Sequence, residues 1–210
     1  MDAAILTGDV VNSGQLPANQ RSTLLTQWLR EALHTLPFEL SQGDTFQLQA
    51  PVADALAVAL RIRAHLRAVA PLNGYRPDAR ISIGLGTVTF AGRGLNKSAG
   101  PAFERSGRGL HSLKQRQPQL LLTSSNPTLD AGTNTSLALL EILLQRWTPA
   151  QAGIIEAALN ELTQQQIAEL RGVSQPAIQQ QLRAAGWLGV NALLTYYGAV
   201  VALPAPSTPA

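Results

Sequence analysis

The chain has 210 residues, enough for one well-packed core and a small additional domain. Its hydrophobic share of 45% and charged share of 14% exclude a disordered protein, and the lack of cysteine excludes disulfides and thiolate metal sites. The net charge is only +3, and neither a basic leader with a cleavage site nor an apolar run of about 18 residues is present. We therefore expect a cytoplasmic protein that makes no membrane contact.

The periodicity of apolar residues and the turn signals predict an N-terminal α+β domain. In chain order we expect a strand over 3–11, a helix over 17–36, a hairpin over 38–48, a helix over 51–70, a strand over 80–90, a helix over 102–114 and a strand over 119–123. This order, β-α-β-β-α-β-α-β, is typical of a ferredoxin-like α+β sandwich with a mainly antiparallel sheet. We expect its helices to cover one face of that sheet.

A basic segment covers the loop before the helix expected over 102–114 and that helix itself. Between residues 93 and 116 a single acid, Glu104, accompanies six cations, which are Arg93, Lys97, Arg105, Arg108, Lys114 and Arg116. Such a patch suits phosphate groups, although a solvated helix face is the commoner explanation for a run of charge. From it we select Arg93, Lys97 and Arg105 as candidate ligand-binding residues.

The remaining chain is predicted to be helical and to divide into further units. Residues 124–134 are rich in Ser, Thr, Asn, Pro and Gly, and an apolar helix is expected over 136–147. The domains that we expect are 1–124 for the α+β part, 125–147 for a linker with a bridging helix, 148–200 for a helix-turn-helix domain and 201–210 for a disordered tail.

The spacing within residues 148–185 predicts the helix-turn-helix. Thr148-Pro149 is a helix start, and Thr163 with Gln166 has the spacing of a capping box. A small residue, a glycine and an apolar residue follow at the offsets that a tight helix crossing needs; they are Ala168, Gly172 and Ile178, with Ile167, Leu170, Val173 and Leu182 as supporting core. Ser174 is expected to cap the next helix.

This segment resembles the DNA-binding helix-turn-helix of bacterial regulators, whose second helix enters the major groove. The residues expected to contact DNA are Thr163, Gln175, Gln179, Gln180 and Arg183, because glutamine pairs with adenine and arginine with guanine or phosphate. A helical hairpin used only for packing is the other interpretation. Residues 146–210 hold three Lys or Arg and three Asp or Glu, so dimerisation or the basic patch would have to supplement DNA affinity.

Two aspartates point to a metal site in the α+β domain. Asp9 ends the first predicted strand and Asp44 lies in the hairpin turn, so their carboxylates are expected at one end of adjacent strands. Two carboxylates and a backbone carbonyl, assigned to Val10, are ligands that Mg²⁺ or Mn²⁺ with a triphosphate would use. A single Gly-Asp in a hairpin is usually a plain turn, so the metal-site hypothesis depends on two of them standing on adjacent strands.

Four motifs in order resemble the SatD family of bacterial proteins, and through it the class III nucleotide cyclase catalytic domain. They are LTGDVVNS, QGDTFQL, ARISIGLG and GPAFERSGRGL. The resemblance implies that Asp9 and Asp44 hold two metal ions, that Arg108 stabilises a transition state, and that the site forms across a homodimer. Glu104 stands where the cyclases have asparagine, and Leu40 replaces the lysine that reads adenine, so part of the catalytic machinery departs from the family.

Three functions follow as hypotheses. The first is a transcription regulator whose cyclase-like domain binds a metal–nucleotide or cyclic nucleotide and whose helix-turn-helix binds DNA. The second is an active nucleotidyl cyclase or transferase that uses Asp9, Asp44 and Arg108, with Glu104 at a catalytic position. The third is a scaffold in which both parts serve protein contacts.

Overall fold

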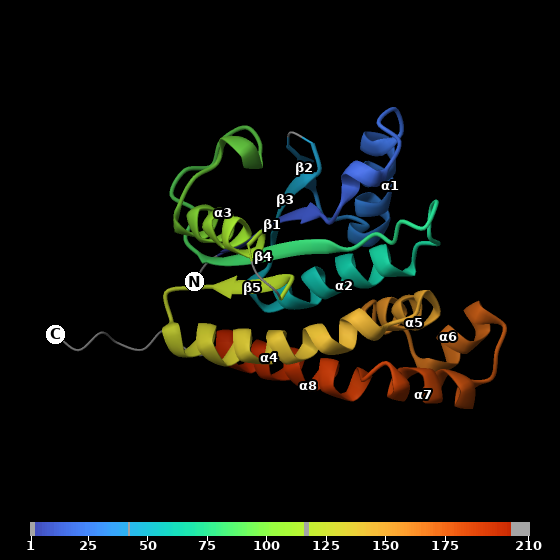
Figure 1. Ribbon diagram of the computed structural model, residues 1–210. Helices are drawn as coiled ribbons and strands as arrows, with labels where there is room; N and C mark the ends of the chain where they lie inside the picture. Colours follow the sequence, from blue (N-terminus) through green and yellow to red (C-terminus); the bar gives the residue numbers. More distant parts are fainter. Residues whose placement is uncertain (1–2, 42, 116–117, 203–210) are drawn as a thin grey trace.

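The computed structural model describes residues 3–41, 43–115 and 118–202 (Figure 1). Its strands are β1 (Ala3–Val10), β2 (Phe38–Leu40), β3 (Thr45–Ala50), β4 (Ala79–Gly86) and β5 (Leu120–Thr123). Its α-helices are α1 (Arg21–Leu33), α2 (Ala55–Ala68), α3 (Pro101–Leu113), α4 (Pro127–Arg146), α5 (Pro149–Leu159), α6 (Gln164–Arg171), α7 (Gln175–Ala184) and α8 (Trp187–Val201). Short 3-10 turns are η1 (Ser13–Gln15), η2 (Val52–Asp54) and η3 (Leu95–Lys97).

The strands form one five-stranded sheet in the order β2-β3-β1-β4-β5. Only the β4–β5 pair is parallel among these strands, so the predicted element order and the mainly antiparallel sheet are confirmed. The hairpin between β2 and β3 turns at Gly43, whose φ of 84° lies in the left-handed region that glycine adopts without strain. The fold class is a mixed α+β arrangement.

Helices cover both faces of the sheet, so the expectation of helices on one face is wrong. Figure 1 shows α3 on one side of the sheet and α2 on the other. All eight residues of β1 are buried, and a strand buried on both faces needs cover on both sides. On the α3 side, the hydroxyls of Thr7 and Ser106 lie 2.9 Å apart in a hydrogen bond.

The segment after β5 also differs from the prediction, because residues 127–134 belong to a helix rather than a linker. Asn126 caps α4 by accepting hydrogen bonds from the backbone N–H groups of Thr128 and Leu129, and Pro127 occupies the first helical turn. The cap and the proline start α4 well before Ser136. The polar composition that suggested a loop therefore forms the first turns of the helix.

The C-terminal helices pack onto the α2 side of the α+β part and share its hydrophobic core (Figure 1). Polar contacts also join the two parts. The indole N–H of Trp147 donates to the carbonyl of Ala185 at 2.8 Å, and the Tyr197 hydroxyl donates to the carbonyl of Val52 at 2.7 Å. The domain boundaries remain a prediction, but the core is continuous across them.

The helices and the turn predicted for residues 148–185 are present. Thr148 and Thr163 form capping boxes, and Gly172 ends α6 with a φ of 64°. Two of the expected core residues are instead exposed: Leu170 at 72% and Val173 at 48%, because both lie on the outer side of the α6–α7 turn. Ser174 stands at the N-cap of α7, but its side chain makes no capping hydrogen bond.

Helix α8 extends to Val201, the first residue of the predicted tail, and residues 203–210, on which most of that prediction falls, lie outside the described residues. Within residues 3–202, gaps excepted, no single helix is long and apolar enough to cross a membrane. The pair α7 and α8, bent by 69°, meets the length and composition criteria together.

Candidate functional site

Asp9 lies at the end of β1 with its carboxylate almost fully buried, at 3% exposure. It stands opposite Arg80 of β4, whose Nε donates to Asp9 Oδ1 at 2.8 Å. From the end of α3, Lys114 Nζ lies 3.4 Å from Asp9 Oδ2. Each carboxylate oxygen therefore has a cationic partner.

Asp44 lies next to Asp9 along the sheet but has different contacts. The backbone N–H of Val10 donates to the Asp44 carbonyl at 3.3 Å, so the two aspartates do end adjacent strands, as predicted. The Asp44 carboxylate accepts a hydrogen bond from the hydroxyl of Ser13 in η1. The two carboxylates thus bind separate partners.

These contacts do not fit a divalent ion held jointly by Asp9 and Asp44. A hard cation such as Mg²⁺ needs free carboxylate oxygens, and those of Asp9 face a guanidinium and an ammonium group. Within the described part of the chain, no three His, Asp or Glu side chains are grouped as ligands of one metal ion. The assignment of Asp9, Asp44 and Val10 to a metal stays a prediction that this arrangement does not favour.

The candidate catalytic residues of α3 face solvent. Glu104 and Arg108 are 64% and 73% exposed, and Arg108 Nη1 lies 3.6 Å from Glu104 Oε2, an i,i+4 ion pair of little energetic consequence. Arg105 instead turns back to the sheet, where its Nη1 donates to the Leu85 carbonyl at 2.6 Å. Arg108 is therefore available to a ligand or a second chain, whereas Arg105 has a structural partner.

The glycine-rich loop before α3 presents Arg93 and Lys97 to solvent. Its backbone N–H groups at Leu95 and Asn96 donate to the carboxylate of Glu39, at 2.8 and 2.9 Å. An acidic side chain from β2 thus occupies the amides that an anion would use. Arg116, the last member of the predicted basic patch, lies outside the described residues.

Helix α7 has one buried and one exposed side. Ile178 and Leu182 are buried, while the residues assigned to DNA contact, Gln175, Gln179, Gln180 and Arg183, are exposed. Thr163 caps α6 through its side chain. Figure 1 shows α3 and the loop before it at the opposite end of the molecule from α7. The basic patch therefore cannot supplement DNA contacts of α7 within one chain.

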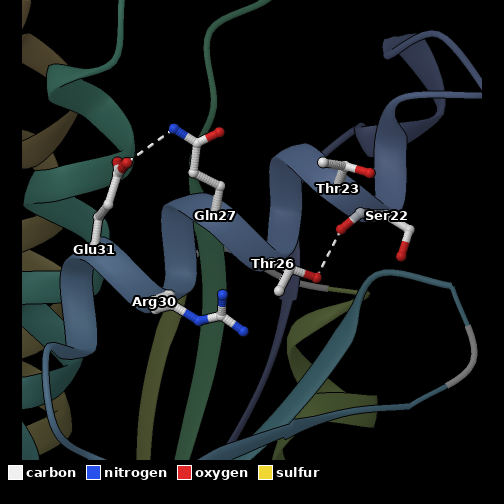
Figure 2. A pocket seen from close by; sticks show the side chains of 6 residues that line it. All are labelled: Ser22, Thr23, Thr26, Gln27, Arg30 and Glu31. Carbon is white, nitrogen blue, oxygen red and sulfur yellow. Dashed lines mark hydrogen bonds between the residues drawn. The ribbon is translucent and has the colours of Figure 1, made fainter.

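Two surface hollows lie away from the aspartates. Figure 2 shows one of about 400 Å³ on α1, lined by Ser22, Thr23, Thr26, Gln27, Arg30 and Glu31. All six residues come from one helix, and Gln27 Nε2 donates to Glu31 Oε1 at 2.9 Å, so it is a groove on a helix surface. A second hollow, of about 740 Å³, lies between the β2–β3 edge and the loop at 91–98.

One titratable cluster connects the α+β part to α5. The His65 ring on α2 has its Nδ1 2.8 Å from Glu156 Oε1 of α5 and its Nε2 3.3 Å from Glu31 Oε2 of α1. On the same side of α2, Arg61 donates to Asn160 at 3.3 Å. Burial alone would lower the pKa of His65, but Glu156 and Glu31 outweigh burial and raise that pKa above its usual value.

We expect the fold to lose stability as pH rises through the folded-state pKa of His65. Because that pKa is raised, the stabilisation that His65 contributes is complete at pH values below its unfolded-state pKa of about 6.5. It disappears at pH values above its folded-state pKa. Urea unfolding measures the free energy of unfolding at about pH 6 and pH 8.5. From the lower to the higher pH, this free energy should decrease more for the native chain than for His65→Gln. Equal decreases in the two proteins would mean that His65 carries no stabilising charge.

Sequence reasoning did not select Arg80, Lys114 or Glu39 as site residues. Arg80 was detectable, because it is the one charged residue in the strand Ala79–Gly86. Its position opposite Asp9 depends on the β1–β4 register, which no local pattern shows. Lys114 was counted within the basic patch, but its contact with Asp9 requires the docking of α3 on the sheet.

Comparison with known proteins identifies no family for this chain. No protein-family model matches this sequence, so membership of the SatD family stays a prediction, and no curated protein sequence matches it. Two solved structures of a bacterial light-regulated adenylyl cyclase are similar to 59% of this chain, at 19% and 18% identity and TM-scores of 0.43 and 0.41. The chain corresponds to 43% of the length of each.

Proposed function

We propose that the protein is a DNA-binding transcription regulator in which α7 is the recognition helix and the α+β domain is a ligand sensor. The observation that carries the proposal is the exposed polar side of α7 beyond the Gly172 turn. Gln179 and Arg183, one helical turn apart, are residue types that pair with adenine and guanine edges. On the opposite side of α7, the buried side chains of Ile178 and Leu182 pack into the hydrophobic core and hold the helix in place.

The charge of the module makes dimerisation part of the proposal. Residues 148–202 contain two cations, Arg171 and Arg183, and three acids, Glu156, Glu161 and Glu169. Because DNA affinity depends strongly on the number of phosphates neutralised, one such module binds weakly. A homodimer presents two α7 helices to two half-sites and doubles the contacts. The ligand that we propose for the sensor domain is a nucleoside triphosphate or a cyclic nucleotide, with exposed Arg108, Arg93 and Lys97 as phosphate contacts.

Alanine at Gln179 or Arg183 is expected to weaken DNA binding by about 1–3 kcal/mol each, the usual value of a base contact. The matched control is Arg146→Ala, which removes an exposed cation at the end of α4. Fluorescence anisotropy with DNA from the region upstream of its own gene measures the difference. If Arg146→Ala weakens binding as much as Arg183→Ala, α7 is not the recognition helix.

A second candidate, an active nucleotidyl cyclase or transferase, is supported by the position of Asp9 and Asp44 at the ends of neighbouring strands. Mg²⁺ or Mn²⁺ would supply Lewis-acid activation there, but Lys114 would first have to leave Asp9. Incubation with each of the four nucleoside triphosphates and Mn²⁺ decides the matter. Pyrophosphate release that disappears in Asp44→Ala would establish this second function in place of the first.

A further inference from the structure

The carboxylate of Asp9 is neutralised by side chains of its own chain. A buried carboxylate is costly unless it is paired and hydrogen-bonded. Arg80 meets one oxygen at 2.8 Å and Lys114 approaches the other at 3.4 Å. The three groups together carry a charge of +1, so a divalent ion entering beside them would be repelled rather than attracted.

The two cations are held differently. Arg80 is fixed by the strand ladder, because it lies directly opposite Asp9 in the β1–β4 register. Lys114 follows the last residue of α3, and that helix end is anchored by the buried side chains of Leu110 and Leu113. The Lys114 side chain is 48% exposed, and its ammonium group stands at the end of a flexible carbon chain. Lys114 is therefore the partner that a substitution can remove without disturbing the core.

We propose that the Lys114 ammonium group occupies the cation position beside Asp9, so that this carboxylate binds no divalent ion while Lys114 is present. The sensor domain then meets the negative charge of a ligand with its own side chains instead of through a metal. The inference goes beyond the proposed DNA binding and does not depend on it, since metal occupancy is measured without DNA.

The test is the Asp9-dependent binding of Mn²⁺ to the full chain, followed by the electron paramagnetic resonance signal of free Mn²⁺. The proteins are the native chain, Lys114→Met, Asp9→Asn, the Lys114→Met/Asp9→Asn double variant, and Arg146→Met as the matched control. Arg146 is an exposed cation at the end of α4, outside the proposed ligand site. Circular dichroism confirms that each variant is folded.

We expect the native chain, Asp9→Asn and Arg146→Met to bind Mn²⁺ equally poorly. Lys114→Met should bind it at least tenfold more tightly, the effect of removing one adjacent positive charge from a buried carboxylate. The double variant should lose that gain. The inference is overturned if Asp9→Asn weakens Mn²⁺ binding in the native background, or if folded Lys114→Met gains no site. Lys114→Gln provides a second test should the methionine variant not fold.

Discussion

Replacement of Arg63 by methionine is expected to destabilise the protein by about 3–5 kcal/mol, the cost of leaving a buried charge without its partner. Arg63 on α2 is fully buried, and it donates to Asp78 at 2.8 Å and to Glu141 of α4 at 2.6 Å. Burial alone would lower the pKa of the guanidinium, but the two carboxylates outweigh burial and raise it. The same side chain thus connects α2, the start of β4 and α4.

Urea unfolding followed by circular dichroism measures this change, with Arg30→Met on the exposed side of α1 as the control. Addition of Glu141→Gln to Arg63→Met should recover part of the lost stability, because the amide removes the unpaired buried charge. A decrease of less than about 1 kcal/mol for Arg63→Met would contradict the buried network.

Replacement of Gly84 by alanine is the second large effect, with an expected loss of about 2–3 kcal/mol from overpacking. A Cβ atom at this position in β4 would lie 2.2 Å from the Ala102 carbonyl oxygen and 2.5 Å from the Ser106 nitrogen. Both are backbone atoms of α3, so the helix itself would have to move from the sheet. The close approach of α3 to β4 is therefore possible only with glycine here.

The matched control for Gly84→Ala lies on α3, the helix that packs against Gly84. Gly107 of α3 has no atom within 4 Å of an added Cβ, so Gly107→Ala should leave stability unchanged or raise it by up to about 1 kcal/mol. Thermal unfolding of the two variants measures their stability. It shows whether the loss comes from contact between the added Cβ atom and α3 or from any replacement of glycine in this region. Equal stability of both variants would show that α3 does not press on Gly84.

Local signals in the sequence predicted most of the elements because those signals act over a few residues. Thr163 and Gln166 cap one helix start, Gly172 adopts the left-handed turn, and Gly43 turns the β2–β3 hairpin. The start of α4 was missed because Asn126 and Pro127, read as linker residues, are also a strong helix start. Composition alone does not separate these two uses.

The arrangement of helices and the partners of the site residues could not be predicted from local patterns. The nearly continuous burial of β1 and β4 requires cover on both faces of the sheet, but this is visible only once their place in its centre is known. Likewise Arg80 meets Asp9 through strand register, and Lys114 meets it through the docking of α3. Leu170 was assigned to the core by spacing, yet tertiary packing leaves it exposed.

The proposed function is tested most directly by an anisotropy titration of the full chain with labelled DNA from the region upstream of its own gene. It is performed at about 50 and 200 mM salt, with and without a nucleoside triphosphate. We expect binding that is weaker at the higher salt concentration and that changes when the nucleotide is added. If no salt-sensitive binding is observed with or without nucleotide, the protein is not the regulator that we propose.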